Sequence, residues 1–191
     1  MAIMLFRIKS YLLFLIKSSN QHGVHSPFVF NLITKCFYDR KKKKSYPEIK
    51  SIAKNNTIEI SFKNAKLLNR LIPYFNYKNI LISENTATSI SKILSIGNTI
   101  SISDTYKNKV QFDFCFINIT ELNTNLIETI FSKVHNDSLV LINAIHTSKE
   151  SKLIWDQIVS HPKTKVTIDT YDLGFIFFRK EQVKEHFVIR M

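Results

Sequence analysis

The sequence predicts an α/β protein whose mostly parallel β-sheet lies between layers of helices. From residue 79 onward, apolar runs of strand length alternate with amphipathic runs of helix length. Two of the strand-length runs, residues 139–142 (LVLI) and 175–178 (FIFF), are apolar at every position, which indicates strands buried on both faces. The 191-residue chain is 45% hydrophobic with only three glycines and four prolines, which excludes collagen-like and low-complexity classes. Together these observations predict a Rossmann-like fold.

The first predicted element is an amphipathic helix over residues 1–16. Arg7 and Lys9 interrupt its apolar run, so it is too short to span a membrane and does not have the pattern of a signal peptide. With Lys17 these cations form a basic rim, and such a helix either lies on a membrane surface or docks on the protein's own core. Docking is the interpretation that we favour, and peripheral membrane contact stays open as the alternative.

Two further helices are expected before residue 75. Ser26 and Pro27 mark the start of one, because serine is a favoured N-cap residue and proline fits the first helical position. The other runs from about residue 62 to residue 72, capped by Ser61 and ended by Pro73. We therefore expect a single domain, residues 1–191, in which residues 1–75 form a helical layer and residues 76–191 a Rossmann-like core.

The core is predicted to contain about six strands. Strands are expected at residues 79–83, 99–103, 112–118, 138–143, 165–169 and 174–179, and helices at 88–96, 124–134 and 148–160, the last opening on a capping box from Thr147 to Glu150. Only residues 170–173 join the last two strands, so these must form an antiparallel hairpin. Only seven residues separate Asp104 from Phe112, which is too short for a crossover that contains a helix.

Several stretches of the sequence resemble one known family. They are NQHGVHSPFVFNLITKCFYD (residues 20–39), AKLLNRLIPYF (65–75), HNDSLVLIN (135–143), HPKTKVTIDT (161–170) and GFIFFRKEQVKEHFVIR (174–190). With the antiparallel last strand, they resemble a bacterial family of class I S-adenosylmethionine-dependent methyltransferases with an HGVHSPF-type N-terminus. The resemblance covers most of the chain, and it implies a methyltransferase sheet. Because the seven residues after Asp104 cannot hold the helix, strand and helix that the family inserts there, we expect the wing on the adenine side to be missing.

The resemblance also implies a cofactor loop after the first strand, where family members carry an acidic residue and glycines. Here the loop, ILISENTATS at residues 80–89, has no glycine: Ile82 replaces the acid, and Glu84 and Thr88 replace two glycines. Asp104 stands where the family places the acidic residue that binds the ribose hydroxyls. Asp104, Ser83 and Asn118 are therefore interpreted as vestigial S-adenosylmethionine-binding residues.

The acidic residues that relatives use for metal binding or for orienting the acceptor are replaced. Asn118, Asn143 and Ala144 stand at these positions, and none of them can serve as a general base. We expect no catalytic residue and no metal site, and hence a pseudoenzyme with weak or absent cofactor binding and catalysis. An active methyltransferase on an unknown acceptor is one alternative.

A basic binding module is the other alternative. The chain has 27 basic and 15 acidic residues, a formal charge of +12, which favours anionic partners. Tyr38 and Tyr46 flank a cationic run that could contact nucleic acid, and this run consists of Arg40, Lys41, Lys42, Lys43 and Lys44.

Five remaining residues bear on the cellular compartment and on possible metal or acid–base chemistry. The distant cysteines Cys36 and Cys115 are expected as free thiols of a cytoplasmic protein. His22 and His25 lack partners for a metal site. His146 is expected as a solvated loop residue.

Overall fold

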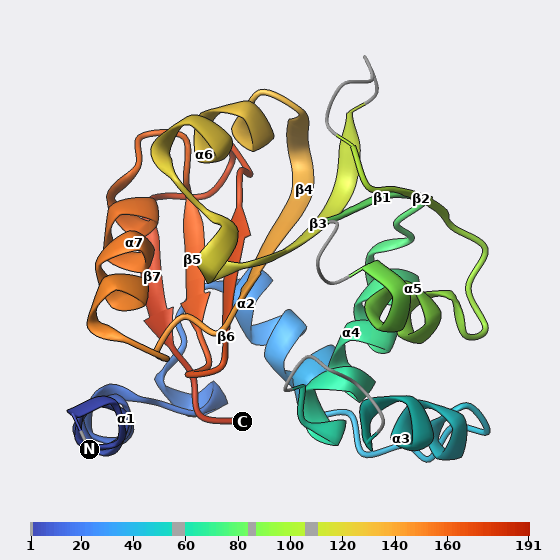
Figure 1. The fold of residues 1–191 in the computed structure, drawn as a ribbon, viewed down its shortest axis with the longest axis horizontal. Helices are drawn as coiled ribbons and strands as arrows, with labels where there is room; N and C mark the ends of the chain where they lie inside the picture. The colour runs from blue at the N-terminus through green and yellow to red at the C-terminus, as the bar shows by residue number, and fades with distance from the viewer. Residues whose placement is uncertain (1, 55–59, 84–86, 106–110) are drawn as a thin grey trace.

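A seven-stranded sheet forms the centre of the molecule (Figure 1). The computed structural model describes residues 2–54, 60–83, 87–105 and 111–191. The strands lie in the order β2-β1-β3-β4-β6-β5-β7, and β6 runs antiparallel to both of its neighbours. The strands are β1 (Asn79–Ile82), β2 (Ser101–Ser103), β3 (Phe112–Asn118), β4 (Val134–Asn143), β5 (Val166–Asp169), β6 (Leu173–Phe177) and β7 (Glu185–Val188). The predicted α/β sheet and its antiparallel hairpin are confirmed.

Helices cover both faces of the sheet. The α-helices are α1 (Ala2–Lys17), α2 (Pro27–Leu32), α3 (Tyr46–Lys54), α4 (Phe62–Phe75), α5 (Ala87–Ser95), α6 (Thr124–Phe131) and α7 (Lys149–Ser160). Short helical turns occur at η1 (Gln21–Gly23), η2 (Ile33–Phe37) and η4 (Ile119–Glu121). One apolar cluster packs α4 and α5 against one face, and a second packs α6 and α7 against the other. This two-sided burial explains why the central strands are apolar at every position.

The seventh strand, β7, was not expected from the sequence. It adds to the edge of the sheet beside β5, in parallel, with Val166 opposite Glu185. Edge strands bury less of their surface than central strands, so the polar segment around Glu185 and His186 carries no strong apolar signal. At the opposite edge lies β2, and it reaches β3 through residues 104–111, of which the structure describes 104, 105 and 111.

Helices α3, α4 and α7 differ from the sequence predictions. Helix α4 continues past Pro73 to Phe75. A proline has no N–H for the carbonyl of Asn69 one turn earlier, and the side-chain amide of Asn98 donates to that carbonyl instead (3.4 Å). Helix α3 was not predicted at all. At α7 the N-cap is Ser148, whose hydroxyl accepts from the backbone N–H of Ser151 (3.1 Å), one residue later than the predicted cap.

Helix α2 begins at Pro27 with Ser26 as its N-cap, as predicted, and a π-helical turn, η2, follows it. Arg70 on α4 is buried and donates hydrogen bonds to the carbonyls of Cys36 (2.9 Å) and Phe37 (3.1 Å). The guanidinium thus satisfies two backbone acceptors at the end of that turn.

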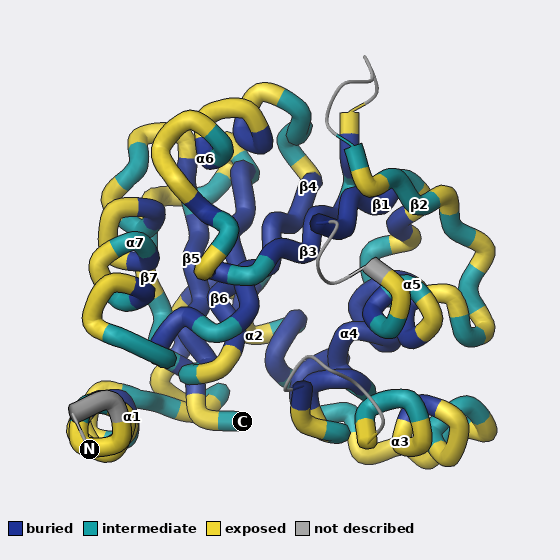
Figure 2. Tube along the Cα trace, in the orientation of Figure 1, coloured by how far each residue is buried: buried dark blue, intermediate teal, exposed yellow. Residues whose placement is uncertain are grey.

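Helix α1 lies at the periphery of the fold, next to the carboxyl ends of β5 and β7 (Figure 1). Figure 2 shows that most of its length is exposed. Within the described ranges, the structure has no helix with the length and apolar character needed to cross a membrane.

Candidate functional site

Four strand ends gather the residues that the sequence singles out. Because β1, β2, β3 and β4 are parallel, Ser83, Asp104, Asn118 and Asn143 all follow or end strands at the same edge of the sheet. Asn118 and Asn143 are register partners across β3 and β4. In Rossmann-like sheets this carboxyl edge is where ligands bind.

Ser83 is buried, and its hydroxyl donates to the carboxylate of Glu121 (Oγ to Oε1, 3.0 Å). Glu121 ends the η4 turn that follows β3, so this bond ties the end of β1 to the end of β3. Glu121 is not among the site residues predicted from the sequence. Its only sequence signal was its place three residues beyond the end of a predicted strand.

Asn118 has a local structural role. Its side-chain oxygen accepts hydrogen bonds from the backbone N–H of Thr120 (3.1 Å) and from the Thr120 hydroxyl (2.8 Å). This arrangement caps η4. The acceptor oxygen that a cofactor or metal would use is therefore already engaged.

The residues at the end of β4, Asn143 and Ala144, also have structural roles. Asn143 is buried, and Ala144 adopts a left-handed backbone conformation with φ of 66°. The Ala144 N–H donates to the carbonyl of Asp172 (2.8 Å), and its carbonyl accepts from the Thr147 hydroxyl (2.9 Å). This strained residue turns the chain from β4 toward α7.

The remaining predicted positions are only partly described. Asp104 is exposed beyond β2 at the edge of the sheet, Ile82 is buried in β1, and Thr88 is exposed on α5. Glu84, which is expected to replace a glycine of the cofactor loop, lies outside the described residues. Among the residues that the structure describes, no three His, Cys, Asp or Glu side chains are grouped to hold a metal ion.

A buried polar cluster links α1 to the sheet. His146 Nδ1 lies 2.8 Å from Ser10 Oγ, and His146 Nε2 lies 2.7 Å from Asp169 Oδ2. All three residues are buried, and the Tyr171 ring stacks on the imidazole with centroids 4.9 Å apart. The expectation that His146 is solvated was therefore wrong, because α1 covers the loop in which it lies.

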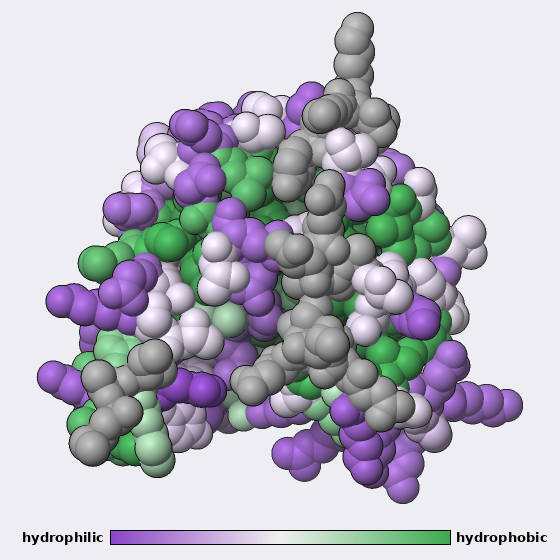
Figure 3. Space-filling model, viewed as in Figure 1, coloured by the Kyte–Doolittle hydropathy of each residue, from purple (hydrophilic) through white to green (hydrophobic). Residues whose placement is uncertain are grey.

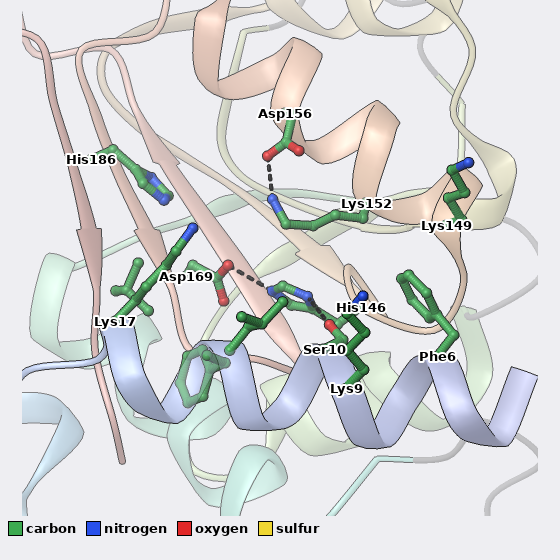
Figure 4. A pocket seen from close by; sticks show the side chains of 13 residues that line it. Phe6, Lys9, Ser10, Lys17, His146, Lys149, Lys152, Asp156, Asp169 and His186 are labelled. Atoms are coloured by element: carbon green, nitrogen blue, oxygen red, sulfur yellow. Dashed lines mark hydrogen bonds and ion pairs between the residues drawn. The ribbon is translucent and has the colours of Figure 1, made fainter.

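This cluster forms one wall of a cavity of about 520 Å³ between α1 and α7 (Figure 4). Lys9 and Lys17 line it from α1, and Lys149 and Lys152 line it from α7. Lys152 pairs with Asp156 on the same helix. The order Ser–His–Asp resembles that of hydrolases, but here the serine lies inside a helix and serves to anchor it.

The cationic run lies in a second, shallower region. Arg40, Lys41, Lys42 and Lys44 are exposed between η2 and α3, where hydrophilic side chains gather in Figure 3. Beside them is a cavity of about 670 Å³, whose basic lining residues are Arg40, Lys63, Lys66, Arg70 and Arg190.

The flanking tyrosines of this run make contacts within the protein. The Tyr38 hydroxyl donates to the Arg190 carbonyl (2.7 Å), and the Lys66 ammonium lies 5.4 Å from the centre of the Tyr46 ring. Their predicted role in stacking on bases is untested.

Comparison with known proteins identifies the fold. No family model matches the sequence, and no curated protein matches it. A candidate caffeoyl-CoA O-methyltransferase from Staphylococcus aureus matches with a TM-score of 0.55 at 13% identity, over 71% of this chain and 93% of that one. The S-adenosylhomocysteine-bound methyltransferase PaMTH1 of Podospora anserina matches with a TM-score of 0.54 at 7% identity, over 83% of this chain and 98% of that one.

A methyltransferase from Geobacter sulfurreducens is similar in the same way. Its TM-score is 0.51 at 8% identity, over 75% of this chain and 92% of that one. At such identities the likeness establishes the fold alone. The chain has the class I methyltransferase fold that the sequence resemblance predicted.

Proposed function

We propose that this chain is a degenerate S-adenosylmethionine-dependent methyltransferase-like protein, a pseudoenzyme that binds the cofactor weakly or not at all. One observation carries the proposal. At the carboxyl ends of β3 and β4, where the family resemblance places acidic residues, the chain has Asn118, Asn143 and Ala144. Asn118 and Ala144 make hydrogen bonds that fix the local backbone: Asn118 accepts from the Thr120 N–H, and the Ala144 N–H donates to Asp172.

The three residues at the ends of β3 and β4 do not fit metal-assisted methyl transfer. A hard cation requires charged oxygen ligands, and deprotonation of an acceptor hydroxyl requires a titratable base. Asparagine and alanine supply neither. Asp104, exposed at the end of β2, is the described residue that retains the chemistry needed to accept hydrogen bonds from ribose hydroxyls.

Calorimetric titration with S-adenosylmethionine and S-adenosylhomocysteine tests this proposal, together with thermal shifts. We expect no saturable heat and no stabilisation at millimolar ligand. A functional site would behave differently, because a ligand at one hundred times its dissociation constant stabilises a fold by about 2.7 kcal/mol. Saturable micromolar binding of either ligand would overturn the proposal.

The same titration on two variants decides what such binding would mean. Asp104→Asn removes the negative charge of the carboxylate expected to accept from the ribose hydroxyls, and Glu48→Gln on α3 removes an exposed carboxylate elsewhere as the matched control. If the wild type binds and only Asp104→Asn weakens binding, the site is a functional cofactor site. The active methyltransferase would then replace the pseudoenzyme as the proposed function.

A second candidate function is binding of nucleic acid at the basic surface. The observation that favours it is that Arg40, the first residue of the cationic run, lines one cavity together with Lys63, Lys66 and Arg190. Clustered cations release counterions from phosphates, so the affinity falls steeply with salt concentration.

The triple variant Arg40→Gln, Lys41→Gln and Lys44→Gln tests that candidate by titration with a labelled single-stranded oligonucleotide. Each lost phosphate contact lowers the slope of log affinity against log salt by about 0.7. The control removes the same charge from exposed lysines elsewhere, with Lys78, Lys92 and Lys180 changed to glutamine. Equal losses in the two triple variants would contradict a specific basic site.

We also propose a cytoplasmic location, which the two free cysteines support. Cys36 and Cys115 are buried and unpaired with each other, as expected for a protein in a reducing compartment. Fractionation of cells that express the full chain, followed by detection with an antibody, checks this location.

A further inference from the structure

Helix α1 directs its apolar face away from the protein. Met4, Ile8, Leu12 and Ile16 recur every four residues, so they share one face of the helix, with Leu5 beside them. Their exposed fractions are high: Met4 70%, Leu5 61%, Ile8 50%, Leu12 54% and Ile16 81%. A helix that packs on its own protein normally has the opposite orientation, with the apolar side inward.

Specific contacts hold this orientation. Ser10 and Phe14, which are the buried residues of α1 in the described part of the chain, face the sheet. Ser10 is bonded to His146, and the Tyr171 hydroxyl donates to the Arg7 carbonyl (2.9 Å). The Tyr171 ring also packs edge-on against Tyr11, with centroids 4.9 Å apart. Because these contacts hold the polar side of α1 against the protein, the apolar face of the helix points to solvent.

The charged side chains on α1 itself are all positive. Arg7, Lys9 and Lys17 lie on the helix itself. The cavity beside it is also lined by Lys149 and Lys152 and by the carboxylates of Asp156 and Asp169 (Figure 4). The charge of Lys152 is balanced by its ion pair with Asp156. The whole chain nevertheless carries a formal charge of +12. An anionic surface is therefore the electrostatically matched partner of this side of the molecule.

We propose that α1 is an interfacial anchor that lies in the headgroup layer of an anionic membrane. The outward apolar face enters the boundary of the acyl chains, and Arg7, Lys9 and Lys17 stay at the level of the phosphates, because long basic side chains extend to the polar layer. Two weak signals, an apolar face and a basic rim, together give stable membrane association. The green atoms on α1 at the lower left of Figure 3 belong to this surface.

Charge argues for lipid rather than for a second copy of the chain. Pairing two copies through α1 would bring two sets of arginine and lysine side chains together, and like charges at close range oppose association. Anionic phospholipids on the cytoplasmic side of membranes attract such basic segments.

Vesicle binding tests the anchor. The full-length protein is sedimented with vesicles of phosphatidylcholine alone and of phosphatidylcholine mixed with phosphatidylglycerol, at low and high salt. We expect binding to the mixed vesicles that weakens with salt, and a loss of at least about tenfold in partitioning for the variant Ile8→Gln with Leu12→Gln. Both side chains are exposed, so the variant should keep the wild-type melting temperature.

A matched control removes the same kind of side chain elsewhere. Leu153→Gln with Val183→Gln replaces two exposed aliphatic residues (55% and 71% exposed) outside α1. The proposal requires this control to bind like the wild type. Absence of binding to the mixed vesicles, or equal loss in both double variants, would overturn it.

A fluorescent probe on α1 reports directly whether the helix enters the membrane. Cys36 and Cys115 are buried, so a cysteine introduced as Leu12→Cys can be labelled selectively with an environment-sensitive dye. We expect a blue shift of emission on addition of the mixed vesicles, and none for the same dye at Leu153→Cys. If the protein instead forms concentration-dependent dimers that Ile8→Gln with Leu12→Gln abolishes, and no vesicle shift occurs, a second copy covers the face and the proposal fails.

Discussion

At the scale of single residues, Gly174 shows how closely β6 packs against α7. A Cβ atom at this position would lie 2.5 Å from Cζ3 of Trp155, nearer than side-chain atoms approach. The Trp155 ring is fully buried, so it has little room to move. We expect Gly174→Ala to destabilise the protein by about 1–3 kcal/mol, measured by urea unfolding.

A double-mutant cycle identifies the source of that cost. Trp155→Phe removes the six-membered part of the indole, which holds the atoms nearest to Gly174. Gly174→Ala should therefore cost less in the Trp155→Phe background than in the wild type. If the two substitutions are additive, the close contact with the indole is not the cause.

His146 illustrates a residue whose environment the sequence could not predict. Its hydrogen-bond partners Ser10 and Asp169 lie 136 and 23 residues away along the chain. A loop histidine between a strand and a helix carries no local pattern that distinguishes a buried bridge from a solvated side chain. Its burial follows from where α1 docks.

At the scale of elements, the docking of α1 depends on that bridge. Ser10→Ala would leave the Nδ1 side of a buried imidazole without its partner, at a cost of about 1–3 kcal/mol. Because few side chains of α1 are buried, we expect this cost to appear as local opening of the helix. Hydrogen exchange should accelerate in residues 4–17 and remain unchanged in the sheet.

Ser18→Ala is the matched control for this prediction. In the described part of the chain, the Ser18 hydroxyl donates to the nearby carbonyl of Leu15 on the preceding helix, α1 (3.0 Å). Its loss should leave the exchange of α1 near the wild-type rate. Comparable acceleration in both variants would mean that the bond between Ser10 and His146 does not hold the helix.

Asp113 joins the beginnings of three strands. Its Oδ2 accepts from the backbone N–H groups of Lys78 (2.7 Å) and Asn79 (2.8 Å), and its Oδ1 lies 2.9 Å from His135 Nε2. Burial alone would raise the pKa of Asp113, but the backbone hydrogen bonds from Asn79 and Lys78 and the bond to His135 outweigh it and lower that pKa.

Because its pKa is lowered in the folded state, Asp113 stabilises the fold at neutral pH and less so in acid. The stabilisation from Asp113 is present above the unfolded-state pKa of about 3.9 and is lost as the pH falls through the folded-state pKa. We expect Asp113→Asn to cost about 1–3 kcal/mol at neutral pH. Urea unfolding from about pH 6 to pH 3 should show a smaller acid loss in the variant than in the wild type. Parallel curves would contradict this role.

At the scale of the whole molecule, the two cysteines report on cooperativity. Cys36 belongs to the apolar cluster on the α4 side of the sheet and Cys115 to the cluster on the α7 side. If residues 1–191 form one domain, as the sequence predicts, both thiols should become reactive at the same urea concentration. Thiol-specific labelling followed by mass spectrometry of each site checks this, and two separate midpoints would contradict a single cooperative unit.

The same thiols make the protein sensitive to alkali. Burial raises the pKa of Cys36 to about 12, partly offset by the Arg70 guanidinium, and burial also raises the pKa of Cys115. Each thiol stays neutral in the folded state and ionises in the unfolded chain, so stability falls above about pH 8.5 by up to about 1.4 kcal/mol per pH unit for each thiol. Unfolding between about pH 8.5 and pH 9.5 should show a weaker slope for Cys36→Ala with Cys115→Ala.

By itself, the sequence determined the sheet, its antiparallel hairpin and the shortened connection after β2, because buried strands and short loops leave local apolar and length patterns. It also identified Asn118, Asn143 and Ala144 as neutral residues at strand ends. Only the tertiary structure decided that Ser83 bonds to Glu121, that β7 completes the sheet, that Asn98 supports α4 beyond Pro73, and that α1 presents its apolar face outward. These features depend on contacts between segments far apart in the chain, and periodicity within one segment carries no information about its partner.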